Sequence, residues 1–343
     1  MMRLDAEPIA LAERLVGAPV FGAEPVGGGR NSRVYRVRSA RGDFALKRYP
    51  RRDEDPRDRL GAECRALELM ARHGIDGVPR LVAADAGAGA VLLSWLDGQP
   101  PGPIGAADID QAAGFLARLH ALRSDLGAAD LAPASEACLS GREIDRQIGQ
   151  RLAHLAALPA AEAALRRFLA DRFAALRPAL VARARQLLEQ AGQEFEALLG
   201  PDRRSLVPAD FGFHNALRRS DGSLVFFDFE YFGWDDPVKL TADVILHPGT
   251  ILPPELKQRF RHAAETLYGD DPGFALRLAA CLPLFGLRWV LILLNEFLPE
   301  RWQRRVAAGF SGSWDEAKHE QLARAEALLA ALEEAQGGSG QGS

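Results

Sequence analysis

The sequence contains little cysteine, and its three cysteines, Cys64, Cys138 and Cys281, lie far apart. No C-x-x-C pair is present. A structural zinc site needs clustered cysteine or histidine ligands, so such a site is not expected. A sparse and odd set of thiols is typical of a reducing compartment. The sequence therefore predicts a cytoplasmic protein.

The sequence also lacks a secretory leader and a long uninterrupted apolar run. Its first residues, MMRLDAEPIALAERLVGAP, mix acidic with apolar side chains, unlike the apolar core of a signal peptide. The most apolar segment, residues 282–298, is short for a membrane span and includes Pro283, Arg288 and Glu296. We therefore expect a buried helix at this segment and no membrane partner.

An excess of positive charge is absent as well. Acidic residues outnumber basic ones, giving a net charge of -4, so the chain has no global field that would attract nucleic acid. With 48% hydrophobic and 26% charged residues, the composition is typical of a globular protein. The 343 residues are enough for two lobes or two domains.

Strand patterns dominate the first part of the chain, with one helix among them. SRVYRVRS and DFALKRYP, residues 32–39 and 43–50, alternate as two-sided strands do. Apolar residues then recur at helical spacing from 60 to 71, and Gly74 suits the end of that helix. Residues 78–98 contain two more short strand patterns.

Helix patterns dominate after the Pro/Gly-rich stretch GQPPGPIG. We expect helices within residues 108–124, 143–157, 160–198, 254–268, 273–298 and 315–335, with Pro178 marking a break or a helix start. The one β-like segment in this part is SLVFFDFEY, residues 223–231, which follows a turn at Asp221 and Gly222.

The sequence thus predicts an α+β protein of two lobes. The expected parts are a helical extension at 1–20, a small antiparallel-sheet lobe with one helix at 21–97, a larger and mainly helical lobe at 98–335, and a flexible tail at 336–343.

A glycine-rich loop, VGGGRNS, stands between two expected strands. Glycines let the backbone approach a ligand and direct N–H groups toward it, so Gly28 and Gly29 are candidate phosphate contacts, with Asn31 and Ser32 as further donors. An ordinary turn is the alternative. No Lys-Ser/Thr follows, which excludes a P-loop, and a strand rather than a helix follows, which excludes a dinucleotide-binding fingerprint.

Lys47 lies in the second of these strands, with half-buried neighbours expected around it. It is either an edge lysine that reaches to solvent or a point charge for a phosphate, held by a carboxylate. Glu63 is the candidate carboxylate because it shares a helix face with Leu67 and Met70 and should face the sheet. Glu68 lies off that face.

Three polar residues stand beside apolar ones in the segment LVPADFGFHNALRRSDGSLVFFDFEY. Asp210 is a candidate base that orients an attacking hydroxyl, and Asn215 and Asp228 offer the hard oxygen ligands that Mg²⁺ prefers. Turn chemistry between two strands is the alternative reading of this segment. His214, beside Asn215, is read as a packed side chain, with contact to substrate or phosphate as its alternative.

The order of these features resembles the aminoglycoside phosphotransferase and choline kinase-like superfamily, which has the protein-kinase-like fold. The resemblance covers most of residues 20–300 and is carried by PADFGFHNAL, VFFDFEYFGWDDP and LARLHAL. It implies a base at Asp210, Mg²⁺ ligands at Asn215 and Asp228, and a pair of Lys47 with Glu63. The adenine of ATP is expected on backbone groups around Ser94 and Leu96.

The resemblance further implies that the γ-phosphoryl group of ATP passes, with Mg²⁺, to a hydroxyl of a small polar acceptor. An amino alcohol, an aminoglycoside or a sugar-like molecule is expected, and the D-F-E-Y sequence points to a small polar alcohol. Glu230, Trp234 and Asp235 are candidate contacts to such an acceptor, because acids and an indole face suit a cationic amine. A structural anchor is the alternative for Trp234.

The sequence departs from the family pattern at Pro208, where a histidine is usual two residues before the base. A nucleotide-binding pseudokinase that acts as an interaction module is therefore the alternative function. No A-P-E segment follows Asp228, which makes a protein kinase the less favoured relative.

Overall fold

The computed structural model describes residues 6–27, 32–50, 55–159, 162–307 and 311–338. By its internal contacts the chain forms two compact units. The first joins Met1–Ala137 with Ser205–Asp235, and the second joins Cys138–Arg204 with Asp236–Ser343. Compactness thus divides the chain differently from the lobe boundary predicted at residue 97, and that boundary stays a prediction.

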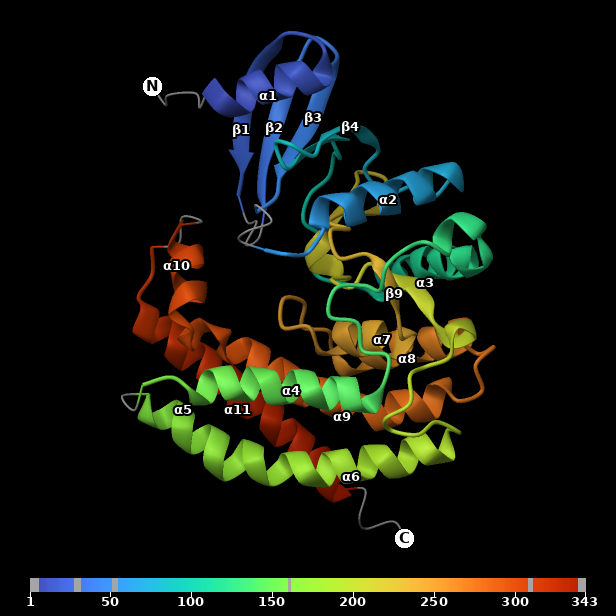
Figure 1. Cartoon of the computed structure of the whole chain (residues 1–343), viewed down its shortest axis with the longest axis vertical. Coiled ribbons are helices and arrows are strands. Elements are labelled where there is room, and N and C mark those ends of the chain that lie inside the picture. Colours follow the sequence, from blue (N-terminus) through green and yellow to red (C-terminus); the bar gives the residue numbers. More distant parts are fainter. Residues whose placement is uncertain (1–5, 28–31, 51–54, 160–161, 308–310, 339–343) are drawn as a thin grey trace. The chain divides into compact units, whose positions relative to one another are not determined.

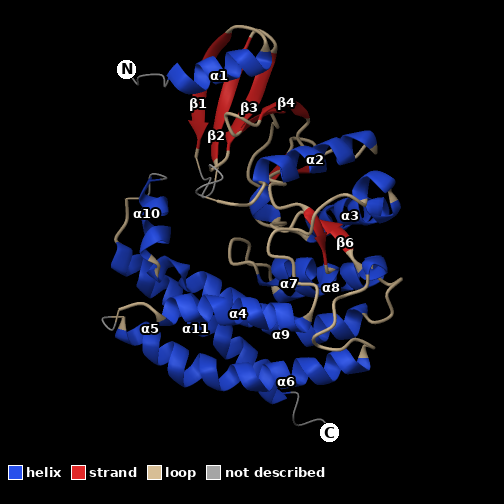
Figure 2. Cartoon of the chain, in the orientation of Figure 1, coloured by secondary structure: helices blue, strands red, loops and turns tan. Residues whose placement is uncertain are grey.

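The first unit contains a five-stranded antiparallel sheet in the order β1-β2-β3-β5-β4 (Figures 1 and 2). Its strands are β1 (Val20–Val26), β2 (Arg33–Ser39), β3 (Gly42–Arg48), β4 (Leu81–Asp85) and β5 (Ala90–Ser94). The two alternating segments predicted from the sequence are β2 and β3. Gly42 has φ +106° at the turn between them, a conformation that side chains other than glycine rarely adopt.

Two helices pack against this sheet within the same unit. α1 (Ala6–Val16) lies over the sheet in Figure 1, and its Leu11 and Val16 join Leu46 and Leu92 in one apolar cluster. α2 (Arg59–Arg72) is capped at its N-terminus by Asp58, whose side chain accepts a hydrogen bond from the N–H of Gly61.

The apolar face of α2 is the one predicted from the sequence. Leu67 and Met70 are buried there together with Glu63. Gly74, with φ +62°, follows the end of the helix as expected.

The rest of the first unit supplies the segment with the three polar residues. It consists of α3 (Ala106–Ala121), β6 (Ser205–Val207), β7 (Ala216–Arg218), β8 (Leu224–Phe226) and β9 (Gly233–Asp235). β7 and β8 form the hairpin expected around the Asp221–Gly222 turn. β6 and β9 form a second antiparallel pair, which the sequence patterns did not indicate.

The second unit is helical in the residues that the structure describes. Its helices are α4 (Gly141–Ala156), α5 (Ala163–Arg167), α6 (Ala174–Gln190), α7 (Pro237–Leu246), α8 (Pro254–Leu267), α9 (Phe274–Leu293), α10 (Pro299–Ala307) and α11 (Trp314–Gly338). α9 packs against α4, α6, α7 and α11.

The helical segment Phe274–Phe297 is long and apolar enough to cross a membrane by length and composition. Of its apolar window, 72% is buried inside the protein. A helix buried to this extent belongs to the core of the protein, as expected for residues 282–298.

α5 and α6 lie within residues 160–198 as predicted, but the break or helix start predicted at Pro178 is wrong. α5 leads into a π-helical segment, Phe168–Phe173, and α6 then continues through Pro178. α6 ends at Gln190, and Gly192 follows with φ +72°. A glycine in the left-handed conformation is typical of the end of a helix.

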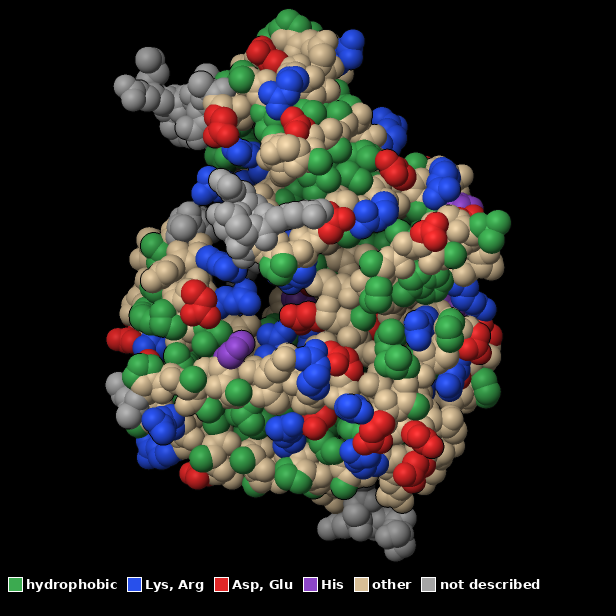
Figure 3. Space-filling view, in the orientation of Figure 1, with side chains coloured by type: hydrophobic (Ala, Val, Ile, Leu, Met, Phe, Trp, Pro, Cys, Tyr) green, Lys and Arg blue, Asp and Glu red, His purple; other side chains and the backbone are tan. Residues whose placement is uncertain are grey.

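The α+β class predicted from the sequence is confirmed by the small antiparallel sheet and the mainly helical remainder. On the face shown in Figure 3, basic and acidic side chains are interspersed. Such mixing is what a nearly balanced composition leads one to expect.

Candidate active site

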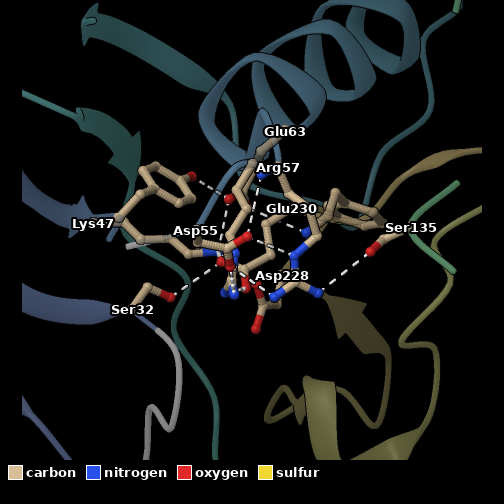
Figure 4. Close-up of polar contacts among 11 residues, drawn as sticks. Ser32, Lys47, Asp55, Arg57, Glu63, Ser135, Asp228 and Glu230 are labelled. Atoms are coloured by element: carbon tan, nitrogen blue, oxygen red, sulfur yellow. Dashed lines mark hydrogen bonds and ion pairs between the residues drawn. The ribbon is translucent and has the colours of Figure 1, made fainter. Parts of the chain in front are cut away.

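Lys47 of β3 is the centre of a buried cluster of charges in the first unit (Figure 4). Its side chain is 6% exposed, and its Nζ lies 2.7 Å from Glu63 Oε2, 2.5 Å from Asp228 Oδ1 and 3.1 Å from Glu230 Oε2. The structure thus brings together Lys47, Glu63 and Asp228, which the sequence singled out from three distant segments.

Glu230 is held by further partners. Its Oε1 accepts a hydrogen bond of 2.8 Å from Arg59 Nη1, and its Oε2 accepts one of 3.1 Å from Ser32 Oγ. Arg59 also pairs with Asp55, and the ring of Tyr231 lies 5.0 Å from its guanidinium carbon. Glu230, with its side chain 1% exposed, is therefore part of the buried charge network.

Burial and charge compete in setting the pKa values of this cluster. Burial alone would lower the pKa of Lys47, but the charges of Glu63 and Asp228 outweigh it and raise that pKa well above its usual value. Burial raises the pKa of Asp228 to about 6 against the attraction of Lys47, and Glu230 and Glu63 add to the rise. Lys47 and Arg59 overcome burial at Glu230 and lower its pKa.

Asp210 lies in the loop that follows β6, and hydrogen bonds within this loop hold its backbone. Ala209 has φ +66° and Asp228 has φ +70°, a left-handed conformation that costs a residue with a side chain roughly 1–3 kcal/mol. The N–H of Asp210 donates to the carbonyl of Pro208 at 2.9 Å. Backbone strain of this kind is concentrated at functional sites, and here it occurs at Asp228 itself and at the residue before Asp210.

Asn215 links the two aspartates through its side chain and its backbone. Its Nδ2 donates to the carbonyl oxygen of Asp210 at 2.9 Å. Its own carbonyl accepts from the N–H of Phe227 at 3.1 Å. Asn215 is thus bonded both to Asp210 and to the residue that precedes Asp228.

The aromatic residues beside the aspartates fix their position. Phe211 and Phe229 each follow a singled-out aspartate in sequence, and both pack on Phe115 of α3, with ring centroids 5.8 Å and 6.2 Å away. Phe226 completes the group at 4.8 Å from Phe115. The apolar flanks noted in the sequence are therefore anchors, from which Asp210 and Asp228 project.

The remaining singled-out residues lie as follows. Gly28, Gly29 and Asn31 are outside the described residues, and Leu96 is half-buried after β5. Ser94, at the end of β5, accepts a hydrogen bond on its Oγ from the N–H of Arg80. Trp234 donates from its indole to the carbonyl of Ala128 at 2.9 Å, and the side chain of Asp235 is fully buried.

Sequence reasoning missed Arg59 and the pairing of Glu230. Arg59 stands at the start of a helix, where an arginine is usually taken for a solvated residue. A signal was present, because Arg59 lies four residues before Glu63 and so shares its helix face. Tyr49, two residues after Lys47 in the sequence, also belongs to the cluster, because its hydroxyl donates to Glu63.

Comparison with known proteins adds to this geometry. The model of a family described as "Phosphotransferase enzyme family" matches residues 22–280. No curated protein sequence matches this chain.

Several solved structures are similar over nearly the whole chain. A spectinomycin phosphotransferase in complex with ADP and spectinomycin is 15% identical, with 96% of this chain and 98% of that chain covered and a TM-score of 0.60. A choline kinase from Streptococcus pneumoniae is 17% identical, with 95% and 99% covered and a TM-score of 0.58. A macrolide 2'-phosphotransferase from Brachybacterium faecium is 19% identical, with 90% and 99% covered and a TM-score of 0.54. At such identities the likeness is one of fold, and it confirms the protein-kinase-like fold.

Proposed function

This chain belongs to the phosphotransferase enzyme family, and we propose that it transfers the γ-phosphoryl group of ATP, with Mg²⁺, to a hydroxyl of a small polar molecule. The matched residues, 22–280, include the whole described charge cluster and the Asp210 loop. The solved structures of similar fold include a spectinomycin phosphotransferase, a choline kinase and a macrolide 2'-phosphotransferase. An aminoglycoside, an amino alcohol or a sugar-like molecule is accordingly the proposed acceptor.

The observation that carries the proposal is the buried pair of Lys47 and Glu63 in contact with the half-buried Asp228. Asn215 connects Asp228 with the loop that holds Asp210 through hydrogen bonds to Asp210 and to Phe227. Phosphoryl transfer needs a positioned nucleophile and neutralised phosphate charge more than covalent chemistry by the protein. Lys47, kept charged by Glu63, would bind phosphate oxygens. Asp210 would orient the acceptor hydroxyl and accept its proton.

Asn215 and Asp228 are the proposed holders of Mg²⁺. Their oxygens are of the hard kind that Mg²⁺ prefers. The Nδ2 of Asn215 is engaged with the carbonyl of Asp210, so its Oδ1 is the atom suited to a metal. Bound Mg²⁺ would supply positive charge to the phosphates of ATP.

The remaining nucleotide contacts follow from the sequence resemblance. Gly28, Gly29, Asn31 and Ser32 would cover the phosphates. Backbone groups near Ser94 and Leu96 would hold the adenine.

The three residues predicted from sequence to contact the acceptor receive less support. Glu230 is buried between Lys47 and Arg59, which favours a role in the charge network. The full burial of Asp235 does not favour contact with an acceptor, and the indole hydrogen bond of Trp234 favours the structural anchor. We therefore propose no acceptor role for these three side chains.

The test is ATP consumption by the purified protein with Mg²⁺ and a panel of choline, ethanolamine, aminoglycosides, macrolides, hexoses and hydroxy amino acids. We expect a large rise with one acceptor class, and loss of that rise in Asp210→Ala while nucleotide binding remains. ATP binding without a rise for any acceptor would favour the pseudokinase. Unchanged turnover in Asp210→Ala would remove the role given to this carboxylate.

A further inference from the structure

We infer that His214 is a positioning residue that orients the carboxylate of Asp210, an inference that rests on the role proposed above for Asp210. The Nε2 of His214 lies 3.2 Å from Asp210 Oδ1. An ionised carboxylate only accepts hydrogen bonds, so the bond assigns the proton to Nε2. The bonded oxygen fixes the rotation of the carboxylate and hence the direction of its second oxygen.

The backbone of Gly212 lies close to the imidazole of His214. A methyl group at Gly212 would lie 2.8 Å from both Cε1 and Nδ1 of His214, closer than such atoms pack. Gly212 has φ 169° and ψ 178°, an extended conformation that any residue adopts. Glycine at this position leaves the space that the imidazole occupies, and an alanine there would displace the ring.

Two consecutive residues then hold Asp210 at two different points. Asn215 binds its backbone carbonyl through Nδ2 at 2.9 Å, and His214 binds its carboxylate. The turn Phe213–Asn215 directs both side chains back to Asp210. Asp210 is more exposed than His214, with 42% and 21% of the two side chains accessible. The carboxylate is thus accessible to a substrate while the group that orients it is more enclosed.

The chemical consequence concerns the rate of transfer and leaves nucleotide binding unchanged. A general base acts only when it is within hydrogen-bond reach of the proton that it accepts. Small misplacements of a reacting group reduce turnover, on the order of 10-fold to 100-fold.

Three variants test the inference by kinetics. His214→Phe keeps a ring without a donor, His214→Gln restores an N–H donor, and Gly212→Ala displaces the imidazole without changing either polar group. ATP turnover is measured with Mg²⁺, both with the acceptor that the panel identifies and with water alone. We expect His214→Phe and Gly212→Ala to lower kcat at least about 10-fold, with KM for MgATP within about 2-fold of wild type. His214→Gln should recover most of kcat.

The half-saturating Mg²⁺ concentration serves as the control for the neighbouring Asn215 and should be the same in all variants. Equal losses of kcat in His214→Phe and His214→Gln, or losses confined to KM for MgATP or Mg²⁺, would overturn the inference, because they indicate support of the fold or of the metal site.

A second readout does not depend on activity. In an NMR spectrum of the imidazole N–H groups, a hydrogen-bonded Nε2 proton of His214 should be protected from exchange with water, and it should lose that protection in Asp210→Ala. The signal is assigned by its absence in His214→Gln. If the wild type consumes no ATP, the proposed function fails and this spectrum alone decides whether His214 binds Asp210. An unprotected proton in the wild type, or protection unchanged in Asp210→Ala, contradicts the inference.

Discussion

At the scale of single residues, the partner of Lys47 is the feature that one substitution tests most directly. Glu63→Gln keeps the shape of the side chain but removes the charge 2.7 Å from Lys47 Nζ. It also weakens the acceptor for the N–H of Phe229, which donates to Glu63 at 3.2 Å. We expect the free energy of unfolding to fall by about 2 kcal/mol, and kcat/KM for MgATP to fall at least about 10-fold. Urea denaturation and steady-state kinetics measure the two effects.

The matched control is Glu68→Gln on the same helix. Glu68 is exposed, so the free energy of unfolding should change by less than about 0.5 kcal/mol and turnover should be unchanged. Equal losses of stability and turnover in Glu63→Gln and Glu68→Gln would contradict the role given to the contact between Glu63 and Lys47.

The buried pair of Arg59 and Glu230 gives a second prediction at this scale. Arg59→Met removes a buried cation shared by Glu230 and Asp55, which keep only Lys47 and Arg57 as partners. It should lower the free energy of unfolding by about 3 kcal/mol. Adding Glu230→Gln should recover at least about 1 kcal/mol of that loss, as a double-mutant cycle measures. Glu230→Gln alone should leave KM for the acceptor unchanged. A higher KM for the acceptor in Glu230→Gln would instead support the contact between Glu230 and the acceptor that the sequence predicts.

The sequence identified some residues of the site but not others. Asp210, Asn215 and Asp228 were recognised because polar side chains amid apolar ones need a reason, and Glu63 was preferred to Glu68 because helical spacing decides which way a side chain points. The helical spacing of Arg59 to Glu63 indicated the face on which Arg59 lies, but not its pairing with Glu230, which lies 171 residues away. A pairing that depends on folding leaves no local pattern in the sequence.

At the scale of elements, length decided what the sequence predicted. β2 and β3 have seven residues each and show full alternation. β6 and β9 have three residues each, too few to show a period of two. Their pairing is set by contacts across the fold, including the Nδ1 of His120, which lies 3.0 Å from Ser205 Oγ in β6.

The start of α3 carries a pH prediction of its own. Although burial opposes it, the hydrogen bonds from Arg218 and from the N–H of Gly105 lower the pKa of Asp108. A carboxyl group with a lowered folded-state pKa stabilises the protein above its unfolded pKa of about 3.9. That stabilisation is lost as pH falls through the folded value.

Asp108→Asn should therefore reduce the free energy of unfolding by about 1–3 kcal/mol at pH 7. The difference from wild type should shrink as pH falls below about 4. Denaturation across this pH range measures it, and Asp130→Asn, at an exposed loop position, is the control. A difference that stays constant with pH would mean that the side-chain charge is not its cause.

At the scale of the whole molecule, nucleotide binding should appear as added stability. A ligand that binds only the folded protein stabilises it by about 2.7 kcal/mol at a concentration of 100 times its Kd. We expect ATP to raise Tm, and to raise it more with Mg²⁺ than with EDTA. Thermal melts of wild type, Asp210→Ala and Asp228→Ala measure the shift.

The two variants separate binding from turnover in the same experiment. Asp210→Ala should keep the full shift in Tm with MgATP, because its carboxylate is proposed to act on the acceptor. Asp228→Ala should lose the difference between Mg²⁺ and EDTA. A shift equally dependent on Mg²⁺ in Asp228→Ala would assign the metal to other ligands.

Phe115 also bears on which substitutions can change the turnover of this enzyme. Its ring supports Phe211 and Phe229, and through them the two aspartates that stand 18 positions apart in the chain. A single substitution at Phe115 would thus displace both aspartates. A mutational search that varies only residues touching substrate would overlook this position, although its effect on turnover would resemble that of two simultaneous active-site mutations.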